Sequence, residues 1–335
     1  MHYDEKYMRR ALELARHGLG NTSPNPMVGA VIVDNNGRII GEGYHRRCGE
    51  GHAEVNAVAS VKDKNLLKDS TIYVTLEPCS HYGKTPPCAK LIIDSGIPRV
   101  VVGAGDPFKE VAGRGIRMLR DSGVEVVEGV LAEESYKLNR RFMTAHTSGR
   151  PFITLKWAQS SDGFMDSDRA DGHPAKFSTI LTSALMHRWR SLHDAILVGS
   201  GTVIADNPRL DCRLWPGKSP KPIILDRSKG INTAGLKMSD PIILSDYSNL
   251  LNAVEMLYKK GITSVLVEGG TKVLQAFIDE KLWDLARIET APFALGVHGR
   301  VKSPTLKNLC ELSSEVIDGN RIQVYENVSD VLSDG

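Results

Sequence analysis

One histidine, one glutamate and two cysteines occur in an order and at a spacing that suit metal-assisted hydrolysis. His52 and Glu54 stand two residues apart, Cys79 follows a proline, and Cys88 lies a short loop further on. An imidazole and two thiolates suit tetrahedral zinc, and three protein ligands leave a fourth position for water, as in catalytic zinc sites. Zinc lowers the pKa of such a water toward neutrality. We therefore predict one catalytic zinc ion per chain, with His52, Cys79 and Cys88 as ligands.

Glu54 is the expected proton carrier of this site. The segment that starts at Ala53 is predicted to be a buried helix, in which residues two apart point about 200° away from each other. Glu54 and His52 therefore do not simply share one helical face. Zinc deaminases of nucleobases use a carboxylate outside the ligand set, with an H-x-E…P-C…C signature. The alternatives are ordinary buried structural residues and a closed zinc site with His81 as its fourth ligand.

The loop between the two cysteines restricts which zinc deaminases the chain can resemble. It holds eight residues, 80–87, where the general signature has two. Together with Glu77-Pro78-Cys79, this loop resembles the deaminase domain of the bifunctional riboflavin-biosynthesis deaminase-reductases. Further agreement is found at residues 24–29, 41–45, 106–107 and 111–115.

The resemblance implies a cytidine-deaminase-like, three-layer α/β domain over residues 1–146. Its expected reaction is the deamination of 2,5-diamino-6-(5-phosphoribosylamino)pyrimidin-4(3H)-one to the corresponding uracil. The resemblance also implies that Asn25 reads the pyrimidine edge and that His45, His81 and Lys84 contact the ring, ribose or phosphate. By residue type alone, Asn25 is a turn residue and the other three are solvated loop residues.

Length and composition bound the class of protein. A chain of 335 residues is long enough for two domains with a core each. Its 42 basic and 40 acidic residues give a net charge of +2, so no global basic field attracts a polyanion. The five scattered cysteines do not resemble a disulfide framework. The sequence shows no apolar signal segment and no apolar run of about 18 residues, so we expect a cytoplasmic enzyme without a membrane span.

Hydrophobic periodicity and turn residues predict two α/β halves joined near residues 146–151. In the first half, helices are expected at 4–17, from 53, from 86, at 111–122 and at 132–146, and strands at 27–33, 38–43, 71–76, 99–103 and 124–127. In the second, residues 151–335, strands are expected at 152–157, 195–198, 223–225, 242–244, 264–267 and 285–290, and helices at 182–192, 249–260 and 271–280.

The second half shows no dinucleotide-binding G-x-G-x-x-G fingerprint in a strand-turn-helix setting. Glu268-Gly269-Gly270-Thr271 instead leads from a predicted strand into a helix, whose first N–H groups suit a phosphate; an ordinary tight turn is the alternative. A second polar cluster contains Thr202, Asp206 and Arg213, with Arg190 nearby in sequence, and suits a phosphorylated sugar. Structural salt bridges are the competing explanation for both arginines.

Together these segments resemble the reductase domain of the same bifunctional enzymes, which has a dihydrofolate-reductase-like fold and binds NADPH without the Rossmann glycines. The resemblance implies hydride transfer to the ribose C1′ of the deaminated product, which gives a ribityl chain. The residues implied for the cofactor are Ala158, Thr202, Asp206, Gly270, Thr271, Lys272, Val273, Leu274, Gln275 and Ala276. Those implied for the substrate are Arg190, Leu210, Arg213 and Glu268.

Three segments of the second half depart from the family pattern. The usual Leu-Asp-Gly reads Ser161-Asp162-Gly163, and the usual Ala-Pro-Lys-Leu reads Ala291-Pro292-Phe293-Ala294. The expected Ser-x-Trp-Ile-Thr reads Pro174-Ala175-Lys176-Phe177-Ser178-Thr179. A serine that normally meets the substrate and a tryptophan that normally meets the cofactor are thereby replaced.

Three functions are compatible with these observations. The first is a bifunctional deaminase-reductase acting on small phosphoribosyl-pyrimidines, with no nucleic-acid or membrane partner. The second is a deaminase whose second domain is a non-catalytic binding or dimerisation module. The third is a nucleic-acid editing deaminase, which an aromatic content of 6% and a near-zero charge disfavour. Family analogy also suggests a homo-oligomer built through the second domain.

Overall fold

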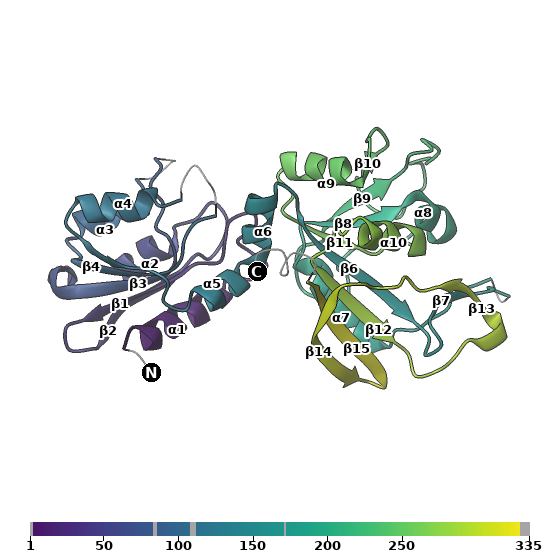
Figure 1. The fold of residues 1–335 in the computed structure, drawn as a ribbon, viewed down its shortest axis with the longest axis horizontal. Coiled ribbons are helices and arrows are strands. Elements are labelled where there is room, and N and C mark those ends of the chain that lie inside the picture. The colour runs from purple at the N-terminus through teal and green to yellow at the C-terminus, as the bar shows by residue number, and fades with distance from the viewer. Residues whose placement is uncertain (1–2, 83–85, 108–111, 171, 329–335) are drawn as a thin grey trace. The chain divides into compact units, whose positions relative to one another are not determined.

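The computed structural model describes residues 3–82, 86–107, 112–170 and 172–328 (Figure 1). The chain divides into two compact units, Met1–Gly149 and Arg150–Gly335. Each unit has its own sheet and its own hydrophobic cores. None of the helices in the described ranges combines the length and the apolar composition needed to cross a bilayer.

The first unit is built on a five-stranded sheet in the order β2-β1-β3-β4-β5. β1 pairs antiparallel with β2 and β3, whereas β3, β4 and β5 run parallel. Its elements are α1 (Tyr3–Arg16), β1 (Gly29–Asp34), β2 (Ile39–Tyr44), α2 (Ala53–Ser60), η1 (Lys64–Asp69), β3 (Ser70–Leu76), α3 (Cys88–Asp94), β4 (Arg99–Ala104), α4 (Arg114–Asp121), β5 (Glu125–Val127), α5 (Ala132–Leu138) and α6 (Arg140–Ser148).

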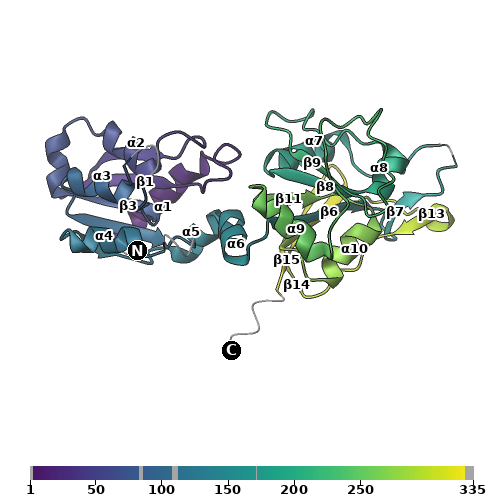
Figure 2. The same cartoon turned by 90° about the horizontal axis from the view of Figure 1, so that it is seen from above.

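Helices cover both faces of this sheet, and the predicted three-layer arrangement is confirmed (Figures 1 and 2). Successive side chains of a strand point to opposite faces. On one face Ile32 of β1 packs with Ala57 of α2 and Ile92 of α3. On the other face its neighbour Val31 packs with Met8 of α1. The removal of these apolar surfaces from water, at about 25 cal/mol per Å², is the main stabilisation of the unit.

Helix α2 lies close against β2 because glycines face it. A Cβ on Gly43 would come within 2.3 Å of the Ala57 nitrogen and 2.5 Å of the Ala53 oxygen, and one on Gly41 within 2.7 Å of the Ala57 oxygen. Because glycine has no side chain, the backbones can approach this closely. The contact fixes the position of the helix that follows His52.

The single helix predicted for residues 132–146 is wrong, because the structure has two helices, α5 and α6. They are separated by Asn139, whose φ of −105° and ψ of 18° are not helical. The Asn139 side chain accepts a hydrogen bond from the Met27 nitrogen and donates one to the Met27 oxygen, both at 2.8 Å. A contact with a segment so distant in sequence leaves no local pattern.

The second unit has an eight-stranded sheet in the order β10-β9-β8-β11-β6-β12-β15-β14 and a separate β13-β7 pair. The six strands from β10 to β12 in this order are parallel, and β15 is antiparallel to both β12 and β14. Its elements are β6 (Phe152–Gln159), β7 (Phe164–Ser167), α7 (Ile180–Ser191), β8 (Ala195–Gly199), α8 (Ser200–Asp206), β9 (Lys221–Leu225), β10 (Ile242–Leu244), α9 (Leu250–Lys259), β11 (Ser264–Val267), α10 (Thr271–Asp279), β12 (Leu285–Thr290), η2 (Gly296–His298), β13 (Gly299–Lys302), β14 (Leu309–Ile317) and β15 (Asn320–Asn327).

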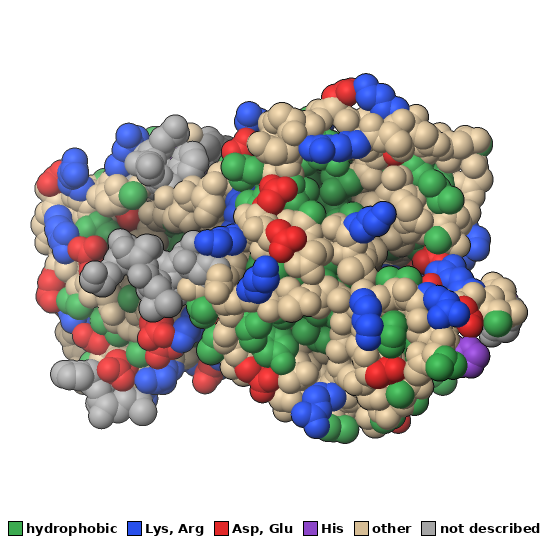
Figure 3. Space-filling view, turned by 45° about the vertical axis from the view of Figure 1, so that its right-hand side comes forward, with side chains coloured by type: hydrophobic (Ala, Val, Ile, Leu, Met, Phe, Trp, Pro, Cys, Tyr) green, Lys and Arg blue, Asp and Glu red, His purple; other side chains and the backbone are tan. Residues whose placement is uncertain are grey.

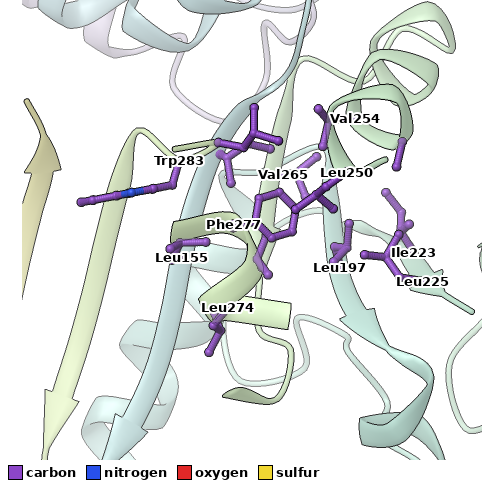
Figure 4. Packing of buried hydrophobic residues seen from close by; sticks show 14 of the residues in the cluster. Leu155, Leu197, Ile223, Leu225, Leu250, Val254, Val265, Leu274, Phe277 and Trp283 are labelled. Carbon is purple, nitrogen blue, oxygen red and sulfur yellow. The ribbon is translucent and has the colours of Figure 1, made fainter. Parts of the chain in front are cut away.

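Helices also pack on both faces of this larger sheet. On one face Phe277 of α10 and Leu250 of α9 pack in one cluster with Leu197 of β8 (Figure 4). On the other face Met186 of α7 packs with Ile196, the neighbour of Leu197 in the same strand. The parallel strands are buried on both faces, which explains why they read as continuous apolar runs in the sequence.

The parallel strands and helices α7, α9 and α10 confirm the elements predicted for this half to within a few residues. Strands β7, β13, β14 and β15 and helix α8 were not predicted. β14 is an edge strand and is exposed along nearly its whole length. It therefore lacks the alternation of apolar and polar residues that identifies a half-buried strand in a sequence.

Candidate metal centre and cofactor-binding edge

The three predicted zinc ligands lie together in the first unit. The ligand atoms of His52, Cys79 and Cys88 are all within 4.8 Å of one another. His52 Nδ1 is 3.7 Å from Cys79 Sγ and 3.3 Å from Cys88 Sγ. Tetrahedral zinc, with bonds of about 2.3 Å to sulfur and 2.05 Å to nitrogen, would place those atoms about 3.6 Å apart. These residues therefore fit zinc, and in the described part of the chain no fourth His, Cys or carboxylate belongs to the cluster.

Each ligand stands at the end of a regular element. His52 is the N-cap of α2, and its φ of −68° and ψ of 168° place it outside the helix, so it is not bound by the helical spacing to Glu54. Cys79 follows the carboxyl end of β3, and Cys88 is the first residue of α3. The N–H of Cys88 donates a hydrogen bond to Cys79 Sγ at 3.2 Å, which favours a thiolate there.

Glu54 lies in the first turn of α2 and is 3% exposed. A carboxylate oxygen can bind a metal ion, but Glu54 is not part of the cluster of ligand atoms. Burial raises the pKa of Glu54 to about 7, and the negative charge of Cys79 adds to the effect. The Cys88 side chain, followed by His52 and the Cys88 N–H, lowers the pKa of the Cys79 thiol. A buried carboxyl group thus stands beside the metal cluster but outside it.

Two of the four residues predicted to contact the pyrimidine substrate lie beside this cluster. The buried ring of His45 is 5.5 Å from that of His52 and nearly perpendicular to it. His45 Nδ1 is 3.2 Å from the Gly51 oxygen, which can only accept, so Nδ1 donates and Nε2 accepts from Asn25 Nδ2 at 3.3 Å. Burial also lowers the pKa of His45, in agreement with a neutral ring. His81 is exposed, and Lys84 lies outside the described residues.

In the second unit, the predicted cofactor residues gather at the carboxyl edge of three neighbouring parallel strands, β8, β11 and β6. Gly199, at the end of β8, is the N-cap of α8, and Gly270, just after β11, is the N-cap of α10. The hydroxyl of Thr202 accepts a hydrogen bond from the Gly270 nitrogen at 3.1 Å and so joins the two turns. Ligands of α/β proteins bind at this edge of a parallel sheet.

Glycine is needed at this edge because α10 approaches β8 closely. A Cβ on Gly199 would lie 2.8 Å from Val273 Cγ2, and one on Gly269 would lie 3.0 Å from Val273 Cβ. With no side chains at these positions, the N-terminus of α10 lies beside the turn that follows β8. The residues present therefore fit the phosphates of a dinucleotide.

The residues of α10 predicted to bind the cofactor have different surroundings. The Thr271 hydroxyl donates to the Lys302 oxygen at 2.7 Å, and Gln275 Oε1 accepts from the Thr305 nitrogen at 3.0 Å. Leu274 is wholly buried in the core, so its side chain contributes packing. Lys272 is exposed, whereas Val273 and Ala276 are half-buried against the core.

Arg190 and Glu268 form a buried two-pronged ion pair. Arg190 Nε and Nη2 donate to the two Glu268 oxygens at 2.8 and 2.7 Å, and Nη1 donates to the Asp211 oxygen at 3.0 Å. The two side chains are only 13% and 10% exposed. Burial alone would raise the pKa of Glu268, but the charge and hydrogen bonds of Arg190, together with the charge of Lys156, outweigh it and bring the pKa to about 2. Arg190 therefore does form a structural salt bridge, the alternative that its sequence position had left open.

The remaining predicted residues lie near this pair or on the strands beside it. Arg213 is exposed and pairs with Asp211, whose backbone oxygen binds Arg190. Leu210 is buried and has a positive φ of 53°. Asp206 pairs with Arg169 at 2.8 Å. Ala158 is on β6, opposite Glu289 of β12.

A group of buried charges was missed by the sequence analysis. Lys156 of β6 lies opposite Arg287 of β12, two residues from Glu289. Arg287 and Glu289 are buried, and burial lowers the pKa of Lys156. Charged residues inside otherwise apolar strands were the available signal, because such residues are retained for pairing or function.

Comparison with known proteins accounts for both units. Residues 1–104 match the model of the cytidine and deoxycytidylate deaminase zinc-binding region. Residues 151–320 match the model of the RibD C-terminal domain.

Full-length relatives give the same result. The riboflavin biosynthesis protein RibD of Bacillus amyloliquefaciens is 40% identical over 325 residues, 88% of this chain and 85% of that protein. A diaminohydroxyphosphoribosylaminopyrimidine deaminase/5-amino-6-(5-phosphoribosylamino)uracil reductase from Thermotoga maritima superposes with a TM-score of 0.86 at 37% identity, over 97% of this chain and 99% of that one. Acinetobacter baumannii RibD superposes with a TM-score of 0.88 at 31% identity, over 97% and 98% of the two chains.

The metal centre can be tested with Cys79→Ser. A serine hydroxyl is a much poorer zinc ligand than a thiolate, so the bound zinc should fall from about one ion per chain to near zero after dialysis against a chelator. Plasma mass spectrometry of the dialysed protein measures this. Cys48→Ser is the matched control, because Cys48 is an exposed thiol of the same unit, and it should keep its zinc. Full zinc in Cys79→Ser would exclude Cys79 as a ligand.

The buried ion pair can be tested with Arg190→Met, which leaves the Glu268 carboxylate buried without its partner. The free energy of unfolding of the second unit should fall by about 3–5 kcal/mol at neutral pH. All four tryptophans, Trp157, Trp189, Trp215 and Trp283, lie in this unit, so urea titrations followed by tryptophan fluorescence report on it alone.

The loss of unfolding free energy in Arg190→Met should shrink as the pH is lowered. The pKa of Glu268 is lowered from an ordinary value of 4.5 to about 2, so the pair stabilises the folded state above about pH 4.5. That contribution is lost as the pH falls toward 2, and the difference between wild type and Arg190→Met should narrow over this range. The double variant Arg190→Met/Glu268→Leu should recover much of the stability. A constant difference between pH 7 and pH 3 would contradict the pairing.

Proposed function

The chain belongs to the RibD family of riboflavin-biosynthesis enzymes, and on this premise we propose that residues 1–146 carry out the deamination and residues 151–335 the reduction. The first reaction hydrolyses the amine of 2,5-diamino-6-(5-phosphoribosylamino)pyrimidin-4(3H)-one with the help of zinc. The second reduces the ribose of 5-amino-6-(5-phosphoribosylamino)uracil to a ribityl chain with NADPH.

In the deaminase unit, His52, Cys79 and Cys88 are the proposed zinc ligands. The metal supplies Lewis acidity, which lowers the pKa of a water molecule. Glu54 receives a proton from that water and delivers it to the leaving amine. The observation that carries this proposal is the convergence of the three ligand atoms within 4.8 Å, with a buried carboxyl group beside them.

Substrate binding in this unit is proposed to use Asn25, His45, His81 and Lys84. The bond from Asn25 to His45 orients the amide of Asn25, so His45 is proposed to act partly through Asn25. His81 and Lys84 belong to the loop between the two cysteines, where the charge of Lys84 suits the phosphate.

In the reductase unit, NADPH supplies the hydride. Ala158, Thr202, Asp206 and residues 270–276 are proposed to line its site, because they cluster at the carboxyl edge of β6, β8 and β11. Arg190, Leu210, Arg213 and Glu268 are proposed to contact the substrate. In support, Arg190 and Glu268 hold each other, and Arg190 also binds the backbone of Asp211, which lies between Leu210 and Arg213 in the sequence. Lys156, half-buried two residues before Ala158 on β6, is proposed to supply a positive charge near the reacting ribose.

The substrates are small molecules, and we propose that no nucleic acid is a partner. Acidic and basic side chains are interspersed on the face seen in Figure 3, in keeping with the net charge of +2. We also propose a reducing, cytoplasmic location, which five unpaired cysteines support. Detection of the chain only in an oxidising compartment would contradict it.

We further propose a homo-oligomer built through the second unit. The exposed edge strand β14, which carries exposed Leu312 and Val316, supports an association there, since an unpaired edge favours pairing with another strand. A monomeric mass by light scattering at micromolar concentration would contradict this.

The assignment of the two reactions to the two units is tested with Glu54→Gln. A one-pot assay follows ammonia release from the diaminopyrimidine and then NADPH oxidation. Ammonia release should fall by about 100- to 10,000-fold, the usual contribution of a general acid-base group, while zinc stays bound. NADPH oxidation with the deaminated pyrimidine supplied directly should be unchanged and is the internal control. Loss of zinc from this variant would show that Glu54 has another role, and absence of NADPH oxidation in the wild type would contradict the reductase assignment.

A further inference from the structure

Glu77 has no role in the chemistry described above, yet four backbone N–H groups donate to its carboxylate. Oε1 accepts from Gly115 at 3.0 Å and from Ile116 at 3.4 Å. Oε2 accepts from Gly113 at 3.0 Å and from Asp106 at 3.3 Å. The residue is only 5% exposed. A buried carboxylate with four donors is held firmly, because each charge-assisted bond is stronger than a neutral one.

The backbone of Glu77 is anchored as well. Its N–H donates to the Ala104 oxygen at 2.9 Å and so extends the pairing of β3 with β4. Cys79 is the second residue after it. Glu77 therefore links the sheet, the start of α4 and the segment that carries a zinc ligand.

Gly115 shows how tightly α4 is pressed onto that segment. A Cβ on Gly115 would lie 1.9 Å from the Pro78 oxygen, well inside contact distance. The first turn of α4 therefore lies directly on the peptide between Pro78 and Cys79. Beyond this peptide, Cys79 is tied to α3, since its oxygen accepts from the Ala89 nitrogen and its sulfur from the Cys88 nitrogen, both at 3.2 Å.

We propose that Glu77 is a positioning residue of the zinc centre. By binding the first turn of α4, its carboxylate holds that turn against Pro78 and so fixes the Cys79 sulfur relative to His52 and Cys88. The inference rests on the proposed role of Cys79 as a zinc ligand. Glutamine has nearly the same shape but turns one acceptor oxygen into an NH₂ group, which would face two N–H donors. The α4 turn would then move away from Pro78 and release Cys79.

The test compares Glu77→Gln with wild type in the full-length zinc enzyme. Zinc affinity is measured by chelator competition, and ligand geometry by the visible absorption of the cobalt-substituted protein, whose bands report tetrahedral thiolate coordination. Residues that orient metal ligands typically contribute about 10- to 100-fold to metal affinity or activity. We expect a loss of that size in zinc affinity, altered cobalt bands and a lower deamination kcat, with NADPH oxidation unchanged.

Two further variants separate positioning from simple stability. Gly115→Ala should reproduce the zinc and cobalt effects mainly through Pro78, whose oxygen its Cβ would meet at 1.9 Å, while Glu77 keeps its carboxylate, and it serves if Glu77→Gln does not fold. Gly105→Ala is its control, since a Cβ there meets nothing within 4 Å. Asp34→Asn controls for the loss of a buried carboxylate, because Asp34 accepts from the Asn36 and Arg38 nitrogens far from the metal ligands in sequence. It should lower the melting temperature and leave zinc affinity unchanged.

The outcomes are distinct. Wild-type zinc affinity and cobalt bands in Glu77→Gln and Gly115→Ala, with only a lower melting temperature, would overturn the inference and leave Glu77 as a helix cap. Absence of zinc from the wild-type enzyme at full deamination would instead overturn the proposed function itself.

Discussion

The first unit depends on bringing three soft ligand atoms from three separate segments within bonding reach of one ion. Each segment is fixed by a different contact. The glycines of β2 set the position of α2 and hence of His52, the end of β3 sets Cys79, and the start of α3 sets Cys88. The contact between α2 and β2 joins backbones, which resist displacement more than flexible side chains do. The site is thus determined by the packing of elements on the sheet.

Burial raises the pKa of both central carboxyl groups, but the net shifts are opposite because different groups face them. Glu54 has no cation as its main partner, so burial dominates and raises its pKa to about 7, at which a carboxyl group can exchange a proton near neutral pH. Glu268 is also largely buried but faces Arg190, and its pKa falls to about 2. A permanently ionised group is poor at proton transfer and good at holding structure. The same residue type thus serves two roles because of what faces it.

Local sequence patterns predicted those elements and site residues that are determined by neighbouring residues in the chain. The order and spacing of His52, Cys79 and Cys88 along residues 52–88 predicted the metal cluster, and continuous apolar runs predicted the buried parallel strands. The pairing of the charges around Lys156 depends on contacts across the sheet, although the charges themselves interrupt apolar strands in the sequence. The break at Asn139 depends on a contact with Met27 and leaves no local trace. The β14–β15 hairpin did leave one, since it turns at Asp318-Gly319, both with positive φ, a dipeptide typical of two-residue hairpin turns.

The departures from the family pattern, which are far apart in sequence, lie together in the fold. Phe177, in place of the usual tryptophan, stacks on Phe293, in place of the usual lysine, with ring centroids 5.9 Å apart and an angle of 16° between planes. The N–H of Ser161, in place of the usual leucine, donates to the Phe293 oxygen at 2.9 Å. An aromatic pair of this kind contributes about 0.5–1.5 kcal/mol beyond its burial. The three changes therefore form one local rearrangement that supplies its own packing, rather than three separate losses from the reductase unit.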